Sequence, residues 1–141
     1  MQRQRDGVEY CKKRIFKIMI KTYTLKKLDI EIKIIINEIG NDLCVIIFGG
    51  DMPHIGCVTL SQPRPSLMNE SVISSTTSII NIIGHKDDII ARYVSEKLSS
   101  SLNKNVVVSC GVHVDNIKDN EIDAIIAMAK ELTELIISDF D

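Results

Sequence analysis

Tryptophan is absent from this 141-residue sequence, and aromatic residues make up only 4% of it. The chain therefore lacks the mixture of basic and aromatic residues with which many proteins bind single-stranded nucleic acids. The shortage of aromatic residues also predicts an aliphatic core, dominated by isoleucine. A hydrophobic content of 45% with 26% charged residues is typical of one soluble globular domain.

Glycine, proline and long apolar runs are also scarce. Seven Gly and three Pro are too few for a collagen-like or disordered chain. Apolar runs such as residues 45–48 are far shorter than the ~20 residues that a membrane-spanning helix needs. The first six residues are largely polar, and no secretory hydrophobic segment follows them. We therefore expect a cytoplasmic protein with no membrane partner.

The cysteines lack the spacing of a metal or redox site. No C-x-x-C pair occurs among the four, which argues against a zinc ribbon or a thioredoxin-type centre. Three of them lie in strand-like apolar runs, where a free cysteine behaves as a small hydrophobic residue. We expect these three to be buried reduced thiols: Cys44, Cys57 and Cys110.

Charge is unevenly distributed along the chain. Residues 1–33 hold ten Lys or Arg and four Asp or Glu, whereas the remainder holds seven and fifteen. A basic segment can indicate a nucleic-acid partner. Here, however, the basic residues alternate with apolar ones, as in Ile15, Lys17 and Met19. That alternation is typical of the water-facing side of a strand, so we expect no nucleic-acid partner.

The first half of the chain is rich in predicted strands. Alternation of apolar and polar residues favours a strand over residues 28–36, and residues 14–23 fit a strand or a short helix. Residues 43–48 are entirely apolar, which predicts a strand with both faces covered. A short strand is expected at residues 57–60, and the prolines within residues 62–66 predict a loop.

Strands and helices alternate in the second half. An apolar strand is expected at residues 79–83, preceded by a hydroxyl-rich segment, and another at 105–110. Apolar residues at helical spacing predict a helix that begins near residues 84–88 and ends at Asn103, and a second helix over residues 119–138. The expected apolar stripes are Ile89, Ile90, Tyr93, Val94 and Leu98, and Ile122, Ile125, Ile126, Ala129, Leu132, Leu135 and Ile136.

This order predicts an α+β fold, with an antiparallel or mixed sheet and two helices packed on one face. We expect a solvated lead-in at residues 1–12 and a single domain at residues 13–141.

All three histidines lie in glycine-marked turns that follow predicted strands, and each turn also holds aspartate. The pairs are His54 with Asp51, His85 with Asp87 and Asp88, and His113 with Asp115. Binding residues commonly lie on loops that a rigid scaffold positions. A functional site is therefore predicted, although each histidine alone could simply hydrogen-bond its own turn.

One interpretation of this site is an anion pocket. Gly84-His85-Lys86 opens a helix, whose free N–H groups and dipole favour a phosphate. The Gly49-Gly50 turn could form a backbone nest for an anion. Further donors would be the hydroxyls of Thr76 and Thr77 and the guanidinium of Arg64. No P-loop or G-x-G-x-x-G spacing is present, and the Ser/Thr run alone would fit a solvated loop.

A second interpretation is a small metal-dependent enzyme with a His/Asp site. The histidines have no metal-type spacing such as H-x-x-x-H, so the fold would have to bring them together. No nucleophile elbow is visible either. Asp87 and Asp88 are expected to cap a helix rather than to serve as an acid–base pair.

Three strings in this order resemble the LpdD-like family: GGDMPHIG at 49–56, GHKDD at 84–88 followed by Ala91-Arg92, and GVHVD at 111–115. The resemblance spans roughly residues 45–125. Members of this family are encoded beside UbiD-type decarboxylases and are described as chaperones for prenylated flavin mononucleotide (FMN). The resemblance therefore implies a chaperone rather than an enzyme, which binds prenylated FMN or FMN.

The resemblance also implies partners and a site. The chain would support maturation of the flavin or its delivery to a UbiD-type decarboxylase, with a flavin prenyltransferase as a further partner, and it would form a homo-oligomer. The ligand's phosphate, polar ring edge and apolar body suit the proposed helix start, the His and Asp turns, and a wall of Ile and Met. The expected cofactor-binding residues are Gly50, Asp51, Pro53, His54, Arg64, Thr76, Thr77, His85, Lys86, Asp87 and His113.

Overall fold

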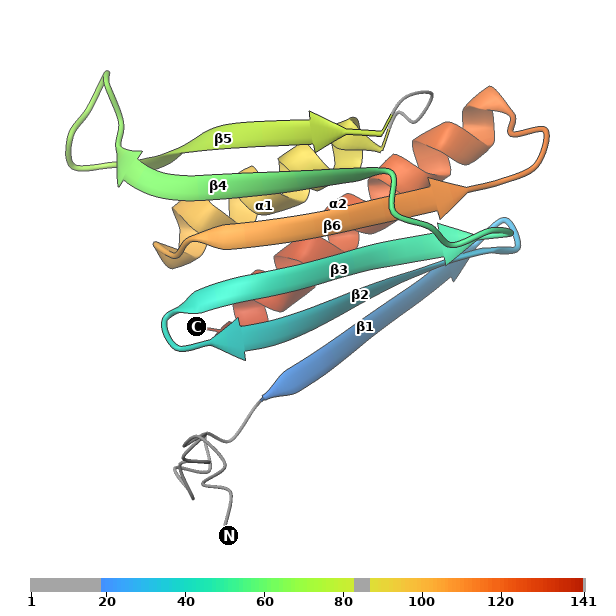
Figure 1. The fold of residues 1–141 in the computed structure, drawn as a ribbon, viewed down its shortest axis with the longest axis horizontal. Coiled ribbons are helices and arrows are strands. Elements are labelled where there is room, and N and C mark those ends of the chain that lie inside the picture. The colour runs from blue at the N-terminus through green and yellow to red at the C-terminus, as the bar shows by residue number, and fades with distance from the viewer. Residues whose placement is uncertain (1–18, 83–86, 141) are drawn as a thin grey trace, which may run out of the picture.

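The computed structural model describes residues 19–82 and 87–140. The described part of the chain has an α+β fold, as predicted (Figure 1). Its elements in chain order are β1 (Ile20–Lys27), β2 (Ile30–Ile39), β3 (Asp42–Gly50), β4 (Cys57–Pro65), β5 (Ile73–Asn81), α1 (Asp88–Leu102), β6 (Val106–His113) and α2 (Asp119–Phe140).

The strands form one six-stranded mixed sheet in the order β1-β2-β3-β6-β4-β5. Neighbouring strands are antiparallel except β3 and β6, which run parallel. β6 therefore lies between β3 and β4, although it follows both in the sequence. Both helices pack on the same face of the sheet, which confirms the predicted layer arrangement (Figure 1). We call the opposite side, which carries no helix, the open face.

The core lies between the sheet and the helices and is aliphatic, as expected. Alternate residues of β2 point into it, and Ile32, Ile34 and Ile36 are fully buried. The alternation arises because successive strand residues face opposite sides of the sheet. Val94 and Leu98 of α1 are also fully buried against this layer.

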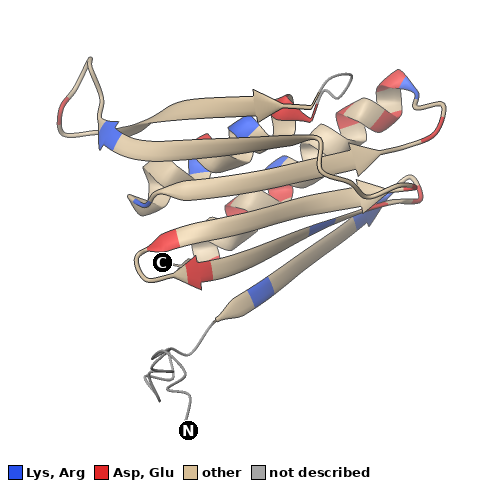
Figure 2. Ribbon diagram, in the orientation of Figure 1, with Lys and Arg blue, Asp and Glu red and all other residues tan. Residues whose placement is uncertain are grey.

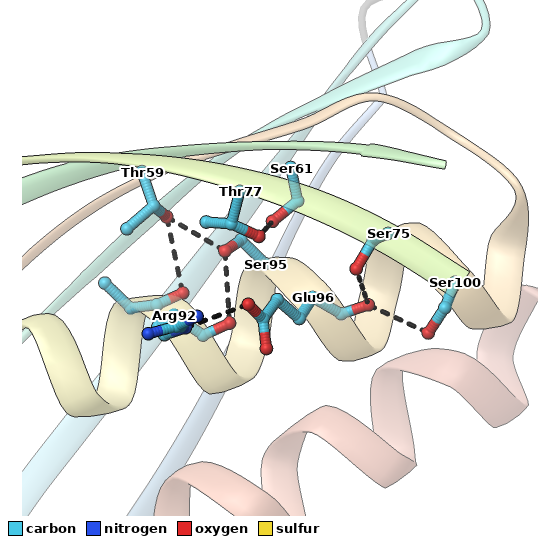
Figure 3. Close-up of polar contacts among 9 residues, drawn as sticks. Thr59, Ser61, Ser75, Thr77, Arg92, Ser95, Glu96 and Ser100 are labelled. Atoms are coloured by element: carbon cyan, nitrogen blue, oxygen red, sulfur yellow. Dashed lines mark hydrogen bonds and ion pairs between the residues drawn. The ribbon is translucent and has the colours of Figure 1, made fainter. Parts of the chain in front are cut away.

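Hydroxyl groups contribute to the packing of β4 and β5 on α1 (Figure 3). Thr59 Oγ1 lies 3.0 Å from Ser95 Oγ and 3.3 Å from the carbonyl oxygen of Ala91. Ser61 Oγ and Thr77 Oγ1 are 2.7 Å apart. These buried polar atoms have partners, as buried hydroxyls require. Part of the Ser/Thr run therefore serves strand packing rather than a loop.

Strand bounds differ from the sequence prediction at three places. β1 continues to Lys27, and Leu28 with Asp29 forms a turn with positive φ instead of opening the next strand. β4 continues through Pro63 to Pro65, where a loop was expected. β4 has no partner in β6 beyond Ser61, so a missing proline N–H costs no ladder bond on that side. β5 already begins at Ile73 and includes most of the hydroxyl-rich segment.

The helices also correct details of the predicted stripes. α1 ends before Asn103, as predicted, and Asn103 itself has the left-handed conformation. Ile89, Ile122 and Leu135 are exposed, however, while α2 buries Met128 and Thr133 that the predicted stripe omitted. Isoleucine and leucine occur on more than one side of each helix, so the position of the sheet decides which side is buried.

β3 is the clearest departure from expectation. Val45 and Ile47 are buried beneath the helices, but Ile46 between them is 43% exposed on the open face. The prediction that both faces of this strand are covered is therefore wrong for the single chain, because both helices lie on the same side.

Candidate functional site

The connection from β3 to β4 passes over the end of β6. This crossing is required because β6 lies between those two strands. Where the connection crosses, a Cβ atom added to Gly111 would collide with the carbonyl group of His54. Gly50 has a φ of +73°, and a Cβ there would collide with the carbonyl group of His113. Two glycines thus permit the close backbone approach that brings His54 to β6.

Asp51 hydrogen-bonds the end of β6 through both its backbone and its side chain. Its N–H donates to the carbonyl oxygen of His113 at 2.7 Å, and its Oδ2 accepts from the N–H of Asp115 at 2.9 Å. The ends of β3 and β6 are therefore tied together on both sides of His113. This links the first of the predicted strings to the third.

Asp87 links the second string to the same place. Its side chain is only 7% exposed. Oδ1 accepts the N–H of Val112 at 3.0 Å, and Oδ2 lies 3.2 Å from Nε2 of His54. The pairing of β4 with β6 stops at Cys57 and Cys110, so the carboxylate takes the place of a strand beside Val112. Asp87 occupies the N-cap position of α1, as expected, but its carboxylate bonds Val112 instead of making a side-chain capping bond.

His54 lies between two oxygen acceptors. Nδ1 is 3.0 Å from the carbonyl oxygen of Met52, and Nε2 faces Asp87. Both ring nitrogens of His54 therefore have a partner, so the ring is held in place between the crossing segment and the residue that precedes α1.

His113 is the second imidazole of the site. Its ring centre lies 6.3 Å from that of His54, with the ring planes at 77°. Its Nε2 is 3.0 Å from Oδ1 of Asp115, and its side chain is 45% exposed. Met52 and Ile55 are also largely exposed on the crossing segment. Two imidazoles and an apolar surface are thus available at one end of the sheet.

The sequence-predicted residues divide into three groups. Gly50, Asp51, His54, Asp87 and His113 are brought together, and Pro53 is exposed on the same crossing segment. His85 and Lys86 lie outside the described residues.

The third group lies elsewhere. Arg64 donates from Nε to Oγ1 of Thr76 at 2.7 Å, near the far end of β4. Arg64 is seven residues beyond Cys57, or about 23 Å along an extended strand. Thr77 bonds Ser61 on the helix-covered face. The expectation that these three side chains join the imidazoles is therefore not met.

The structural role of Gly111 is not evident from the local sequence. The glycine was visible within GVHVD, but the reason for it depends on which strand the β3–β4 connection crosses. Strand order is a property of the whole sheet, so the local sequence carried no indication of it.

The two cysteines beside the site are buried. Cys57 and Cys110 face each other on β4 and β6. Burial, with a further contribution from Asp87, raises the pKa of Cys57 to about 11 and also raises the pKa of Cys110. Both are therefore neutral thiols at physiological pH and poor nucleophiles. The prediction of buried reduced thiols is confirmed for these two, whereas Cys44 is only half-buried.

Across residues 19–82 and 87–140, no group of three or more His, Cys, Asp or Glu side chains is arranged to hold a metal ion. Neither described helix combines the length and hydropathy needed to cross a membrane.

Comparison with known proteins finds relatives both in sequence and in fold. Protein LpdD of Lactiplantibacillus plantarum is 29% identical over 119 residues, which cover 83% of this chain and 82% of that protein. A chain from the crystal structure of a chaperone complex for yeast 20S proteasome assembly shares the fold, with a TM-score of 0.55 and 16% identity. That match covers 88% of this chain and 98% of the other.

The sequence profile of the prenylated flavin chaperone LpdD-like domain matches residues 26–141. This range contains β2 to α2 and all three strings noted in the sequence. The chain therefore belongs to the LpdD-like chaperone family.

Proposed function

We propose that this protein binds prenylated FMN at the β3–β4 crossing and supports its maturation or its delivery to a UbiD-type decarboxylase. The observation that carries the proposal is the convergence of Asp51, His54, Asp87 and His113 at one end of the sheet. The description of the family as prenylated flavin chaperones supports the choice of ligand.

The chemistry of the site suits a flavin with a phosphate group. The exposed edge of His113 can donate to a phosphate or to the polar edge of the ring system, and His54, held between Met52 and Asp87, forms the adjoining wall of the site. Met52 and Ile55 offer apolar surface for the ring body. Apolar contact of this kind replaces the aromatic stacking that the described site lacks.

The exposure of the site fits a carrier. His113, Met52 and Ile55 are open to solvent, so a bound flavin would remain accessible to a second protein. A flavin prenyltransferase would supply the ligand, and a UbiD-type decarboxylase would receive it in the cytoplasm. A carrier needs affinity and release rather than a catalytic group, so we propose a binding role and no reaction of its own.

Anaerobic gel filtration tests the binding step. Reduced prenylated FMN is mixed with the wild type, His54→Ala, His113→Ala or Arg64→Ala, and flavin absorbance is measured in the protein peak. We expect flavin to co-elute with the wild type and with Arg64→Ala, and binding to weaken at least about tenfold in each histidine variant. Absence of flavin from the wild-type peak would refute the proposal, as would equal binding by all four proteins.

The delivery step needs a separate measurement. Loaded protein is mixed with an apo-decarboxylase of the UbiD type, and decarboxylase activity is followed with time. We expect faster activation than with the same concentration of free prenylated FMN. Equal rates from the free and the carried flavin would show that binding serves another purpose.

A further inference from the structure

The open face of the sheet carries an apolar patch that no part of the described chain covers. On β3 and β4 the side chains of Ile46, Val58 and Leu60 are 43%, 37% and 39% exposed. Ile35 and Val107 lie on the same side, because the register pairs them with Ile46 and Leu60. We define these five residues as the open-face patch. In an antiparallel sheet with one wet face, polar residues normally occupy these positions.

Charge is absent from the centre of this face. Charged side chains of β1 and β2 on the open face lie towards the end of the sheet that holds the β3–β4 crossing; they are Lys26, Glu31 and Lys33. β5 and β6 contain no Lys, Arg, Asp or Glu, and the only such residues on β3 and β4 are Asp42 and Arg64 at one end of the sheet (Figure 2). Most charged side chains of this half of the molecule lie on the helices and loops instead. The edge strands are more polar on the open face, with Thr22 and Thr24 on β1 and Ser74 and Thr76 on β5. An uncharged apolar centre with a polar rim is the usual anatomy of a protein interface.

We infer that the open-face patch is the interface of a homodimer, in which two sheets pack face to face with the helices outside. Two antiparallel or mixed sheets commonly pack in this way about 10 Å apart. The inference does not depend on flavin binding. It also accounts for β3, whose sequence predicts burial on both faces.

The size of the sheet fits a stable dimer. Six strands at about 4.8 Å spacing and about 30 Å in length present a face of roughly 800 to 900 Å². A standard protein interface buries about 800 Å² on each partner. A second copy of the same sheet would therefore cover the patch in full.

Charge and symmetry favour a second copy over another partner. The centre of the patch is uncharged, so two copies meet there without repulsion between like charges. A two-fold axis along β6 would place β3 of each copy opposite β4 of the other. Asp42 and Arg64 lie at the same end of the sheet, so that axis would bring opposite charges towards each other at the rim.

Light scattering of the full chain tests the inference, with Leu60→Glu as the disrupting variant and Leu135→Glu as its matched control. Leu135 is 49% exposed on α2, on the other side of the molecule from the patch. We expect the wild type and Leu135→Glu to have twice the 15.8 kDa mass of the chain at micromolar concentration. Leu60→Glu should weaken dimerisation by more than about tenfold, because it buries an unpaired carboxylate. A monomeric wild type, or a folded Leu60→Glu that remains dimeric, would overturn the inference.

A second variant and a second measurement test the dimer even if Leu60→Glu fails to fold. Ile46→Thr with Leu60→Thr keeps two strand-favouring side chains while making the patch polar, and it should also dissociate. Cys44 lies half-buried on the open face, next to Val107 on β6. Its alkylation, followed by peptide mass mapping, should be slower in the dimeric wild type than in the dissociated double variant. Equal alkylation rates in the two proteins would contradict a dimer through this face.

Discussion

The carboxylate of Asp87 accepts a backbone hydrogen bond from β6, as the carbonyl groups of a neighbouring strand do elsewhere in the sheet. It accepts the N–H of Val112 at a position that β4 no longer reaches, and its other oxygen faces His54. A buried carboxylate with two charge-assisted partners is favourable only while both partners remain. One residue thus couples the sheet to the candidate site.

Removal of this carboxylate should therefore affect stability as well as binding. We expect Asp87→Ala to lower the free energy of unfolding by about 2 kcal/mol, because the partly buried N–H of Val112 loses its acceptor. Urea denaturation measures the change, and Asp88→Ala on the first turn of α1 is the control. Equal losses in the two variants would show that Asp87 acts only as a helix-terminal charge.

Tyr23 is a second residue whose contact joins distant parts of the chain. Its hydroxyl donates to Oδ2 of Asp139 at 2.9 Å, which ties β1 to the last turn of α2. Burial, followed by the bond to Asp139 and its charge, raises the pKa of Tyr23 from 10.0 to about 12. The folded state therefore favours the neutral phenol.

The direction of this shift predicts a pH dependence. The stabilisation is complete below pH 10 and is lost as the pH rises from about 10 through 12, because the unfolded chain loses the phenol proton first. We expect Tyr23→Phe to be about 1 kcal/mol less stable at neutral pH and to show a shallower loss of stability in that window. Urea denaturation at several alkaline pH values measures both effects. A slope identical to that of the wild type would contradict the shifted pKa.

Among the elements, the β3–β4 connection depends on glycine in a way that can be tested. Gly111 is needed for space, since His54 passes directly over it, whereas Gly40 in the β2–β3 turn has a φ of +60° and nothing within 4 Å. We expect Gly111→Ala to destabilise by about 2 kcal/mol or more through steric overlap, and also to displace His54 and weaken flavin binding. Gly40→Ala should cost about 1 kcal/mol from its left-handed backbone and leave flavin binding unchanged.

Thermal or urea unfolding and flavin co-elution together check this pair of variants. Unimpaired binding in a folded Gly111→Ala protein would show that the crossing does not position the site.

Several elements could be predicted from local sequence because their determinants are local. The alternation in β2 and the end of α1 at Asn103 depend on side-chain period and backbone preference, and both predictions are confirmed. The end of β4 was missed because the tolerance of Pro63 depends on where β6 begins. The convergence of His54 with His113 was predicted, but the separation of Arg64 from them follows from strand direction, which the local sequence does not contain.

At the scale of the whole molecule, the apolar centre of the open face and the histidine-bearing end belong to different tasks. The middle of β3, β4 and β6 presents an uncharged apolar surface, whereas the polar groups that can hold a ligand are gathered where β3 ends, β4 begins and β6 ends. This division lets a chain assemble with a second copy while its ligand site remains accessible at one end. It follows from strand order, which places β6 at the centre of the sheet.

Amide chemical shifts of the nitrogen-15-labelled protein, recorded anaerobically with and without reduced prenylated FMN, test the central claim most directly. The account predicts that the largest shifts fall on residues 50–56 and 111–115, at the β3–β4 crossing. A groove between β5 and α1, lined by Ile73, Ser75, Tyr93, Lys97 and Ser100, should remain unchanged. Shifts confined to that groove, or no shifts at all, would contradict the account.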